Sequence, residues 1–287
     1  KIMAAYLGFE FIDATEVVRF DENGDFQSEI TNEIMSARLE KAKNAVIPGF
    51  YGATEEGRVV TFSRGGSDVT GSIVARATKA KLYENWTDVS GCLICDPRIV
   101  NNPEPIKTIT YRELRELAYM GATVLHEDAI FPVRAAGIPV NIKNTNQPED
   151  RGTMIVSESA EHCDHIITGI AGKKGMSVIN IEKDKMNSEI GFGKNVLRAL
   201  EKSNVSFEHM PSGVDTMSVV IATEALAGKE TAIIDEIKSR VHPDQIYIES
   251  NLALIAVVGR GMKSARGTAA ILFSALADAR VNIKMID

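Results

Sequence analysis

Residues 59–68 read VVTFSRGGSD, which has the pattern of a strand, a loop and the start of a helix. The apolar, β-branched Val59–Phe62 predicts the strand, and Val69–Ala80 has the periodicity of the helix. Further elements are expected as a helix at Tyr111–Leu125, with Thr110 and Glu113 in capping-box spacing, and a strand at Ile138–Ile142. Strands and helices that alternate at this spacing predict an α/β domain with a largely parallel sheet.

The loop between this strand and helix has the chemistry of an anion site. Gly65 and Gly66 allow the backbone to approach a ligand closely, and a helix N-terminus offers free N–H groups and partial positive charge. Arg64 can hold a carboxylate or phosphate through two parallel hydrogen bonds, and Asp68 can orient a cation or organise the loop. The residues alone leave a second interpretation open, an ordinary turn in which Ser67 or Asp68 caps the helix.

Composition and charge exclude several classes of protein. The chain has 287 residues, of which 44% are hydrophobic and 25% charged, as in globular proteins with two or three domains. Its formal net charge of −7 gives no overall attraction to nucleic acid or anionic lipid. The longest apolar runs, such as Leu252–Val258, are too short to span a bilayer. Three cysteines argue against a disulfide framework and favour a reducing cytoplasm.

Two other motifs have weaker functional signals. WTDVSG at 86–91, followed by DPR at 96–98, predicts a strand that ends in Thr-Asp, where α/β sheets place ligands. Cys92 and Cys95 form a CxxC, but a second ligand pair at zinc spacing is absent from the sequence, so we expect unpaired thiols without metal. Gly259-Arg260-Gly261 lacks the spacing of a dinucleotide loop. His126 and His209 are expected to be structural.

The second half contains an internal repeat at an offset of 76 residues. The offset carries Val178-Ile179 onto Leu254-Ile255 and Gly191 onto Gly267. Each unit has the pattern of a strand, a glycine-containing loop, an amphipathic helix and a strand. The first unit continues with a strand at Met217–Ile221, a helix at Glu230–Val241 and a strand at Gln245–Ile248, a βαββαβ plan of ferredoxin-like type.

The second repeat unit predicts a helix with a buried apolar stripe, followed by a strand that ends at the last residues, VNIKMI. The stripe consists of Leu272, Ala275, Leu276 and Ala279. Since the plan is cut after its second strand, we expect exposed apolar surface there. The chain also opens on Lys1 within a helical pattern, so we expect it to be a fragment of a longer protein.

Taken in order, these motifs resemble aspartokinase over essentially the whole chain: SRGGSD, WTDVSG, DPRIV, MGATVLH at 120–126, and two ferredoxin-like units. VNIKNTNQPEDRGTMIV at 140–156 and MNSEIGFGKNVL at 186–197 are also similar to that family. The resemblance implies a three-layer αβα amino-acid-kinase fold at 1–158, an ACT domain at 159–250 and an incomplete second ACT domain at 251–287. It implies transfer of the ATP γ-phosphoryl group, with Mg²⁺, to the β-carboxylate of L-aspartate, the first step of lysine, threonine and methionine biosynthesis.

Roles are carried over from the family position by position. The resemblance implies a catalytic set of Arg64, Ser67 and Asp68, with Arg64 and Phe50 contacting aspartate. It implies a nucleotide set of Thr87, Asp88, Leu93, Arg98 and Thr123, although the family often has Tyr in place of Leu93 and some members have Lys in place of Thr123. It implies an effector set of Met186, Glu189, Phe192, Gly193, Phe207 and Glu208, whose carboxylates suit lysine.

The resemblance also implies feedback inhibition, a cytoplasmic homodimer or dimer of dimers formed through ACT domains, and no nucleic-acid or membrane partner. The family's N-terminal Lys-Phe-Gly-Gly motif and an acidic residue for the substrate amine are absent from this sequence. We therefore expect the 287-residue chain to be inactive and its parent to be active. The alternative is an amino-acid-sensing ACT module with a degenerate kinase remnant.

Overall fold

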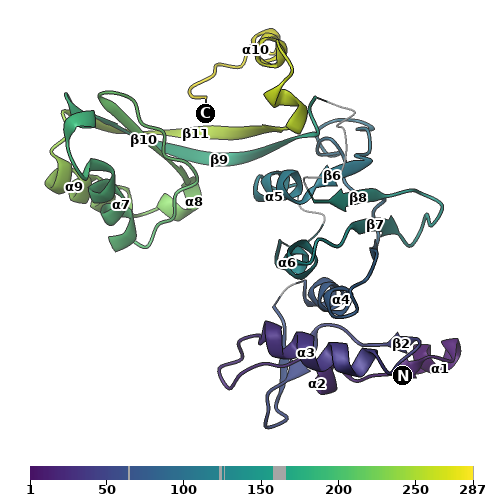
Figure 1. Ribbon diagram of the computed structural model, residues 1–287. Helices are drawn as coiled ribbons and strands as arrows, with labels where there is room; N and C mark the ends of the chain where they lie inside the picture. Colours follow the sequence, from purple (N-terminus) through teal and green to yellow (C-terminus); the bar gives the residue numbers. More distant parts are fainter. Residues whose placement is uncertain (64, 123–124, 126, 158–165, 287) are drawn as a thin grey trace. The chain divides into compact units, whose positions relative to one another are not determined.

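The computed structural model describes residues 1–63, 65–122, 125, 127–157 and 166–286 (Figure 1). The chain divides into two compact units. Unit 1 consists of Lys1–Ala171 and Ala256–Arg266, and unit 2 of Gly172–Ile255 and Gly267–Asp287. The predicted domain boundary at 158/159 lies outside the described residues and stays a prediction. Among the described residues, every helix is too short or too polar to cross a membrane.

Unit 1 is built from short elements. Its helices are α1 (Ile2–Leu7), α2 (Ala14–Val17), α3 (Ser28–Leu39), α4 (Gly66–Ala77), α5 (Tyr111–Tyr119) and α6 (Glu127–Ala135). Its strands are β1 (Glu10–Phe11), β2 (Ala45–Val46), β3 (Tyr51–Ala53), β4 (Val59–Thr61), β5 (Tyr83–Thr87), β6 (Thr108–Thr110), β7 (Val140–Asn144) and β8 (Thr153–Val156). The predicted alternation of strands and helices is confirmed.

The main sheet of unit 1 is mixed, with strand order β5-β7-β8-β6. The pairs β5/β7 and β6/β8 are parallel, as predicted, whereas β7/β8 is antiparallel. The connection at 145–152 is too short for a crossover helix, so these two strands can pair only as a hairpin. Helix α4 packs against α3, α6 and β5, and α5 packs against β6 and β8.

Helix α5 begins as predicted and ends earlier. Thr110 Oγ1 accepts a hydrogen bond from the Glu113 N–H, and the Glu113 carboxylate accepts one from the Thr110 N–H, which completes the capping box. The predicted extension to Leu125 is wrong. The helix ends at Tyr119, because Gly121 takes a left-handed conformation with φ +97°.

From residue 169 onward the chain forms the elements β9 (Gly169–Glu182), η1 (Met186–Ser188), α7 (Phe192–Lys202), β10 (Thr216–Ala222), α8 (Thr223–Leu226), α9 (Glu230–Val241), β11 (Gln245–Val258), η2 (Arg260–Lys263) and α10 (Thr268–Asp278). These elements belong to unit 2, except that β9 begins and β11 ends within the residues of unit 1, and η2 lies entirely within unit 1. The sheet order is β10-β9-β11, and residues 208–212 add an edge beside β10 through antiparallel bridges His209↔Val220 and Ser212↔Met217. This is the predicted ferredoxin-like order.

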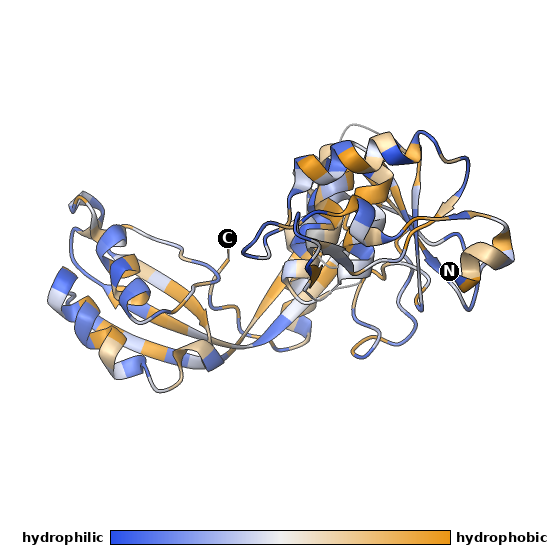
Figure 2. Ribbon diagram, turned by 90° about the horizontal axis from the view of Figure 1, so that it is seen from below, coloured by the Kyte–Doolittle hydropathy of each residue, from blue (hydrophilic) through white to orange (hydrophobic). Residues whose placement is uncertain are grey.

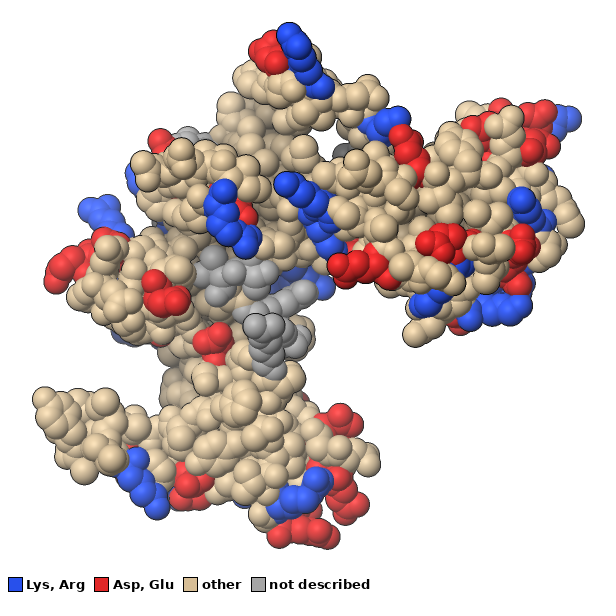
Figure 3. All heavy atoms as spheres, turned by 180° about the vertical axis from the view of Figure 1, so that it is seen from behind, with Lys and Arg blue, Asp and Glu red and all other residues tan. Residues whose placement is uncertain are grey.

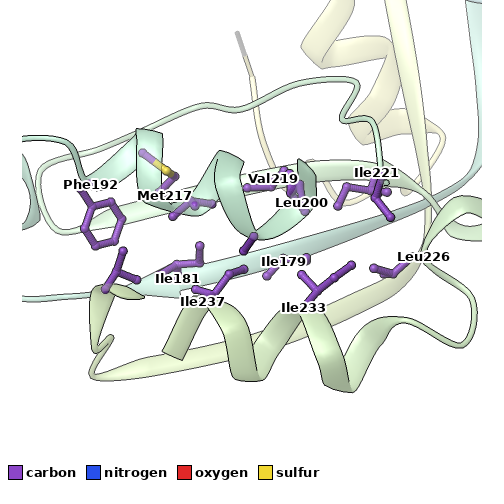
Figure 4. Close-up of a cluster of buried hydrophobic side chains, with 14 of the residues drawn as sticks. Ile179, Ile181, Phe192, Leu200, Met217, Val219, Ile221, Leu226, Ile233 and Ile237 are labelled. Atoms are coloured by element: carbon purple, nitrogen blue, oxygen red, sulfur yellow. The ribbon is translucent and has the colours of Figure 1, made fainter. Parts of the chain in front are cut away.

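The core of unit 2 lies between its sheet and helices α7 and α9 (Figure 4). Ile179 and Ile181 of β9 face Leu200 of α7 and the apolar side of α9, and Val196 of α7 belongs to the same buried cluster. Full burial of each such side chain stabilises the fold by about 1.5–3 kcal/mol. Hydrophilic and hydrophobic residues share each of these helices (Figure 2), as amphipathic helices on a sheet require.

The 76-residue repeat is confirmed at the level of whole elements. Strands β9 and β11 begin and end 76 residues apart, and so do helices α7 and α10. Both helices follow a 3₁₀ turn and a left-handed glycine, Gly191 with φ 84° and Gly267 with φ 85°. The local sequence pattern therefore determines the same strand, turn and helix twice.

The second repeat differs from the prediction in its packing. Leu272 and Leu276 of α10 are only partly buried, and Ala275 and Ala279 are exposed, so the predicted buried stripe is wrong. Residues 281–286 form no strand. Among the described residues, β11 is the only strand of the second repeat, so α10 lacks a completed sheet of that repeat to cover it. The expected exposure of apolar surface is confirmed, with Ile271 at 69%.

Candidate functional site

The loop that precedes α4 has the backbone geometry predicted for a close approach. Gly65 is left-handed with φ 85°, and its carbonyl accepts hydrogen bonds from the Asp68 and Val69 N–H groups. A Cβ on Gly66 would lie 2.6 Å from Cβ of Phe62, so only glycine fits. Arg64 lies outside the described residues, and its predicted role stays a prediction.

Asp68 is held in place by strand β5. The Asn85 Nδ2 donates a hydrogen bond of 3.0 Å to the Asp68 Oδ1 and one of 2.9 Å to the Tyr83 hydroxyl. That hydroxyl also donates to the Asp68 carbonyl oxygen at 3.3 Å, and burial raises its pKa. Asn85 is 6% exposed, so its amide is committed to these two partners. Ser67, one residue before Asp68, is exposed at the helix start.

Phe50 lies beside the same loop. Its φ of 83° is unusual for a residue with a side chain, and its N–H donates to Thr70 Oγ1 at 3.1 Å. The Phe50 carbonyl accepts from the Phe62 N–H at 2.9 Å, and a Cβ on Gly66 would lie 2.8 Å from the Phe50 ring. The ring remains 43% exposed. The structure thus brings Phe50, Ser67 and Asp68 together around one helix N-terminus.

A second polar cluster lies at the carboxyl ends of the parallel strands β5 and β7. Thr87 ends β5, and its hydroxyl donates to the Asp88 carboxylate at 3.3 Å. Asn144 ends β7, and its amide donates to Ser90 Oγ at 2.9 Å, while Ser90 donates to Asp150 at 2.5 Å. Ligands bind to α/β sheets at such strand ends. The predicted nucleotide residues Thr87 and Asp88 therefore stand where a ligand site is expected.

Two of the remaining predicted nucleotide residues, Arg98 and Leu93, lie within the described part of the chain and have different partners. The Arg98 guanidinium pairs with Asp96 at 2.7 Å and is 84% exposed. The hydrogen bond from Arg98 holds the Asp96 pKa below its usual value. Leu93 forms an isolated bridge with Pro105. Thr123 lies outside the described residues.

The two CxxC cysteines differ in their surroundings. Cys92 is buried, and its N–H donates a hydrogen bond to Thr153 Oγ1 at 2.8 Å. Burial raises the pKa of the Cys92 thiol to about 12, so it holds its proton at neutral pH. Cys95 is partly exposed, and both thiols are free. The described residues hold no group of three metal-ligating side chains.

The predicted effector residues lie in unit 2 as two groups. Met186, Glu189, Phe192 and Gly193 surround the turn between η1 and α7, whereas Phe207 and Glu208 lie at the start of the edge beside β10. The Glu208 N–H pairs with the carbonyl of Val220, and a Cβ on Gly193 would lie 3.4 Å from Met217 Cε, three residues earlier along β10.

Each effector carboxylate is paired with a lysine of this chain. Lys183 pairs with Glu189, donates to the Val241 carbonyl at 2.6 Å, and lies 5.7 Å from the Phe192 ring centre. Lys173 on β9 pairs with Glu208 at 2.6 Å. Acidic and basic side chains also alternate on the molecular face in Figure 3, without a large area of one sign among its described residues.

Sequence reasoning missed the residues that support the predicted ones. Four of these residues have no role predicted from the sequence: Tyr83, Asn85, Asn144 and Asp150. The first two lie just before the motif WTDVSG at 86–91, and the other two lie within the family-like stretch at 140–156. One signal was available: a polar Asn within the strand YENWT, where an apolar residue is usual. Its partner could not be read from local spacing.

Comparison with known proteins places two families along the chain. The amino acid kinase family matches residues 3–144, and the ACT domain family matches residues 255–287. Aspartokinase 3 of Bacillus subtilis (strain 168) is 41% identical over 300 residues, which cover 100% of this chain and 65% of that protein.

Solved structures show the same likeness. Clostridium acetobutylicum aspartate kinase matches with a TM-score of 0.93 at 56% identity, covering 100% of this chain and 66% of that chain. E. coli aspartokinase III in complex with lysine and aspartate, in the T-state, matches with a TM-score of 0.72 at 26% identity, covering 97% and 63%. The chain thus spans just under two thirds of the length of these relatives.

Proposed function

The chain belongs to the aspartokinase family, and from this premise we propose that the full-length protein phosphorylates the β-carboxylate of L-aspartate with ATP. The observation that carries the proposal is the cluster of Asp68, Ser67 and Phe50 at the N-terminus of α4, with Asp68 fixed by Asn85. This cluster adjoins the glycine turn of SRGGSD, which suits a carboxylate substrate and a transferring phosphoryl group.

The reaction needs mainly positioning and neutralisation of charge. A β-carboxylate oxygen of aspartate attacks the γ-phosphorus of ATP, the new O–P bond forms, and the bond to the β,γ-bridging oxygen breaks as ADP leaves. Arg64 holds the aspartate carboxylate, and the N–H groups at the start of α4 face the transferring group. Asp68 keeps the loop in register through Asn85.

ATP enters as its magnesium complex, a substrate rather than a resident metal. Mg²⁺ prefers one or two carboxylates plus phosphate oxygens over a cage of protein ligands. The described residues fit this, since they offer the Asp68 and Asp88 carboxylates but no cluster of three ligands. We place the nucleotide at the ends of β5 and β7, where Thr87 and Asp88 lie.

Arg64→Ala in the full-length protein tests the chemistry. Loss of a bidentate contact should cost on the order of 3 kcal/mol or more, which lowers kcat/KM for aspartate more than a hundredfold. Arg58→Ala is the matched control, because Arg58 lies just before β4, is exposed, and donates to the Glu22 carbonyl. Near-normal kcat/KM in Arg64→Ala would contradict the assignment. A wild-type protein that binds amino acids but neither ATP nor aspartate would instead be a sensing module.

We infer further that unit 2 is a regulatory ACT unit and that lysine is its inhibitor. E. coli aspartokinase III has been solved with lysine bound, and Glu189 and Glu208 offer carboxylates to an ammonium group. Since Lys183 and Lys173 already pair with them, an incoming lysine must displace an internal one. Homodimer formation through ACT domains and a cytoplasmic location, supported by the free Cys92 and Cys95, belong to the same proposal.

Glu208→Ala and Lys173→Met test this exchange in opposite directions. Deleting the carboxylate should weaken lysine inhibition roughly tenfold to hundredfold with kcat nearly unchanged, as loss of a charge-assisted contact of about 1.5–3 kcal/mol. Removing the competing internal ammonium should strengthen inhibition. Initial rates are measured against lysine and, separately, threonine.

Lysine without effect on the wild type would make threonine the leading effector. Loss of catalysis together with inhibition in Glu208→Ala would contradict the division into catalytic and regulatory parts. Glu236→Ala serves as the control, because it breaks the ion pairs of α9 with Lys202 and Arg240 in the same unit.

A further inference from the structure

Glu113 is a buried carboxylate that the proposed chemistry does not use. It lies in the first turn of α5 and is 3% exposed. Its Oε2 accepts hydrogen bonds from the Thr110 N–H at 2.9 Å and the Thr110 hydroxyl at 2.7 Å. The first of these bonds is the side-chain half of the capping box, and the two together occupy only one of the two carboxylate oxygens.

The other oxygen, Oε1, accepts hydrogen bonds from residues next to the ends of two long strands, β9 and β11. Thr168, one residue before β9, donates its hydroxyl to Oε1 at 2.7 Å. Arg260, two residues after β11, donates its backbone N–H to Oε1 at 3.1 Å, and its Nε lies 3.3 Å from Oε2. Strands β9 and β11 each span residues of both units, so two of the three chain crossings between the units lie on strands whose unit 1 ends are bonded to this carboxylate.

The backbone segments around Thr168 and Gly259 are closely packed beside Glu113. The Thr168 N–H donates to the Val258 carbonyl at 2.7 Å, which ties the two strands together beside Glu113. A Cβ on Gly259 would lie 2.3 Å from the Ile166 carbonyl oxygen, so the backbones are in close contact. Burial raises the pKa of Glu113, but hydrogen bonds from Thr110, Thr168 and Arg260 outweigh it, and the pKa is lowered.

Strand β9 also contains Lys173, the residue that an incoming lysine is proposed to displace from Glu208. Lys173 on β9 pairs with Glu208, and Thr168 lies five residues earlier along the chain. An effector that displaces Lys173 therefore acts on a strand whose start is held by Glu113. At the other end, α5 leads into residues 120–126, which include the predicted nucleotide residue Thr123.

We propose that Glu113 couples unit 2 to the catalytic unit, by transmitting shifts of β9 and β11 to helix α5. The proposal rests on the proposed function, because it requires an amino acid that binds in unit 2 and inhibits the kinase. Coupling of this kind needs an element with two arrangements that both sites bias. Helix α5 has its first turn bonded to both strand ends, so a shift of either strand must move the helix or break these bonds.

Glu113→Gln in the full-length protein separates coupling from helix capping. Glutamine also serves in a capping box, so α5 keeps its start while the charge facing Arg260 is lost. We expect lysine to bind within threefold of the wild-type affinity by calorimetry, while the lysine concentration for half-inhibition rises at least tenfold. The kcat and the KM for aspartate should remain within twofold, since the polar partners of the Glu113 carboxylate among the described residues are Thr110, Thr168 and Arg260, which lie outside the proposed site.

Two further variants complete the test. Glu29→Gln makes the same chemical change in an exposed pair with Arg76 in unit 1, and should leave binding and inhibition unchanged. Thr168→Val removes the hydrogen bond from the Thr168 hydroxyl to Glu113 and should weaken inhibition without changing lysine binding. This variant decides the question if Glu113→Gln fails to fold.

The outcomes distinguish this inference from the proposed function. Wild-type inhibition curves in both Glu113→Gln and Thr168→Val overturn the coupling and leave the kinase assignment intact. A loss of lysine binding as large as the loss of inhibition also overturns it. If the wild type has no kinase activity, the proposed function fails, and hydrogen exchange tests the coupling by itself. Lysine or threonine should then change protection of the α5 amides in the wild type but not in Glu113→Gln, and equal changes in both, or none, overturn it.

Discussion

Asn85→Ala should impair catalysis through a residue that does not itself face substrate. The Asn85 amide donates 3.0 Å to the Asp68 carboxylate and 2.9 Å to the Tyr83 hydroxyl from a buried position on β5. Truncation removes one bond to a charged group and one to a neutral group. The loss of these two bonds and the small cavity left by truncation should together lower the free energy of unfolding by about 2–4 kcal/mol.

The catalytic effect follows from the freedom that Asp68 gains. A carboxylate released from its fixed donor no longer holds the loop before α4, and a misplacement of about 1 Å can cost a hundredfold in rate. We therefore expect kcat to fall tenfold to hundredfold, with a smaller change in the KM for ATP. The assay is the steady-state rate of ADP formation, with thermal unfolding measured in parallel.

Two comparisons isolate the positioning role of Asn85. Tyr83→Phe removes the neighbouring hydroxyl but keeps the Asn85–Asp68 bond, so it should lower stability with less than a threefold loss of kcat. In Asp68→Ala the partner is already absent, so adding Asn85→Ala should lower kcat no further. Two results would refute the reasoning. One is a further fall in kcat when Asn85→Ala is added to Asp68→Ala, and the other is a kcat within twofold of wild type in a folded Asn85→Ala variant.

Two other predictions follow from buried groups. Cys92, with a pKa of about 12, should resist iodoacetamide at pH 8 while Cys95 is alkylated, as peptide mapping will show, and the double Cys92→Ser/Cys95→Ser variant should stay active. Elemental analysis should find no stoichiometric zinc, and one zinc per chain that the double variant loses would contradict this. Because the folded-state pKa of Glu113 is lowered, its ionisation stabilises the fold above the ordinary value near 4.5, and this contribution is lost as pH falls through the folded pKa. The stability difference between wild type and Glu113→Gln should therefore be largest near pH 7 and shrink below pH 4.5, and a difference that grows in acid would contradict the lowered pKa.

Local pattern was sufficient for much of the secondary structure. The capping box at Thr110, helix α9 and the 76-residue repeat were predictable, because apolar periodicity and capping residues act within a few positions. The end of α5 was predicted too late, since the glycine at 121 was outweighed by a continuing apolar pattern. Packing of α10 could not be predicted from its stripe, because burial depends on what covers the helix.

Family resemblance extended the sequence reading to function, through motifs such as SRGGSD and WTDVSG. It gave roles to Asp68 and Thr87, which the local pattern had already placed at a helix start and a strand end, and the structure confirms these positions in the fold. It could not tell that the effector carboxylates Glu189 and Glu208 pair with lysines of the same chain. Such pairs depend on how neighbouring strands and turns align, and charge pattern alone does not encode that.

The sequence by itself thus determined the two kinds of unit, the repeat and the loop before α4, since each is specified by residues close together in the chain. Only the tertiary structure decided which distant polar groups meet. Asn85 reaches Asp68 across 17 positions, and Glu113 joins Thr168 and Arg260 across 55 and 147. A buried polar group must find its partner wherever the folded backbone brings one, because leaving it unpaired costs more than a hydrogen bond contributes. Those partners are therefore selected by sheet register and packing, which no local periodicity reveals.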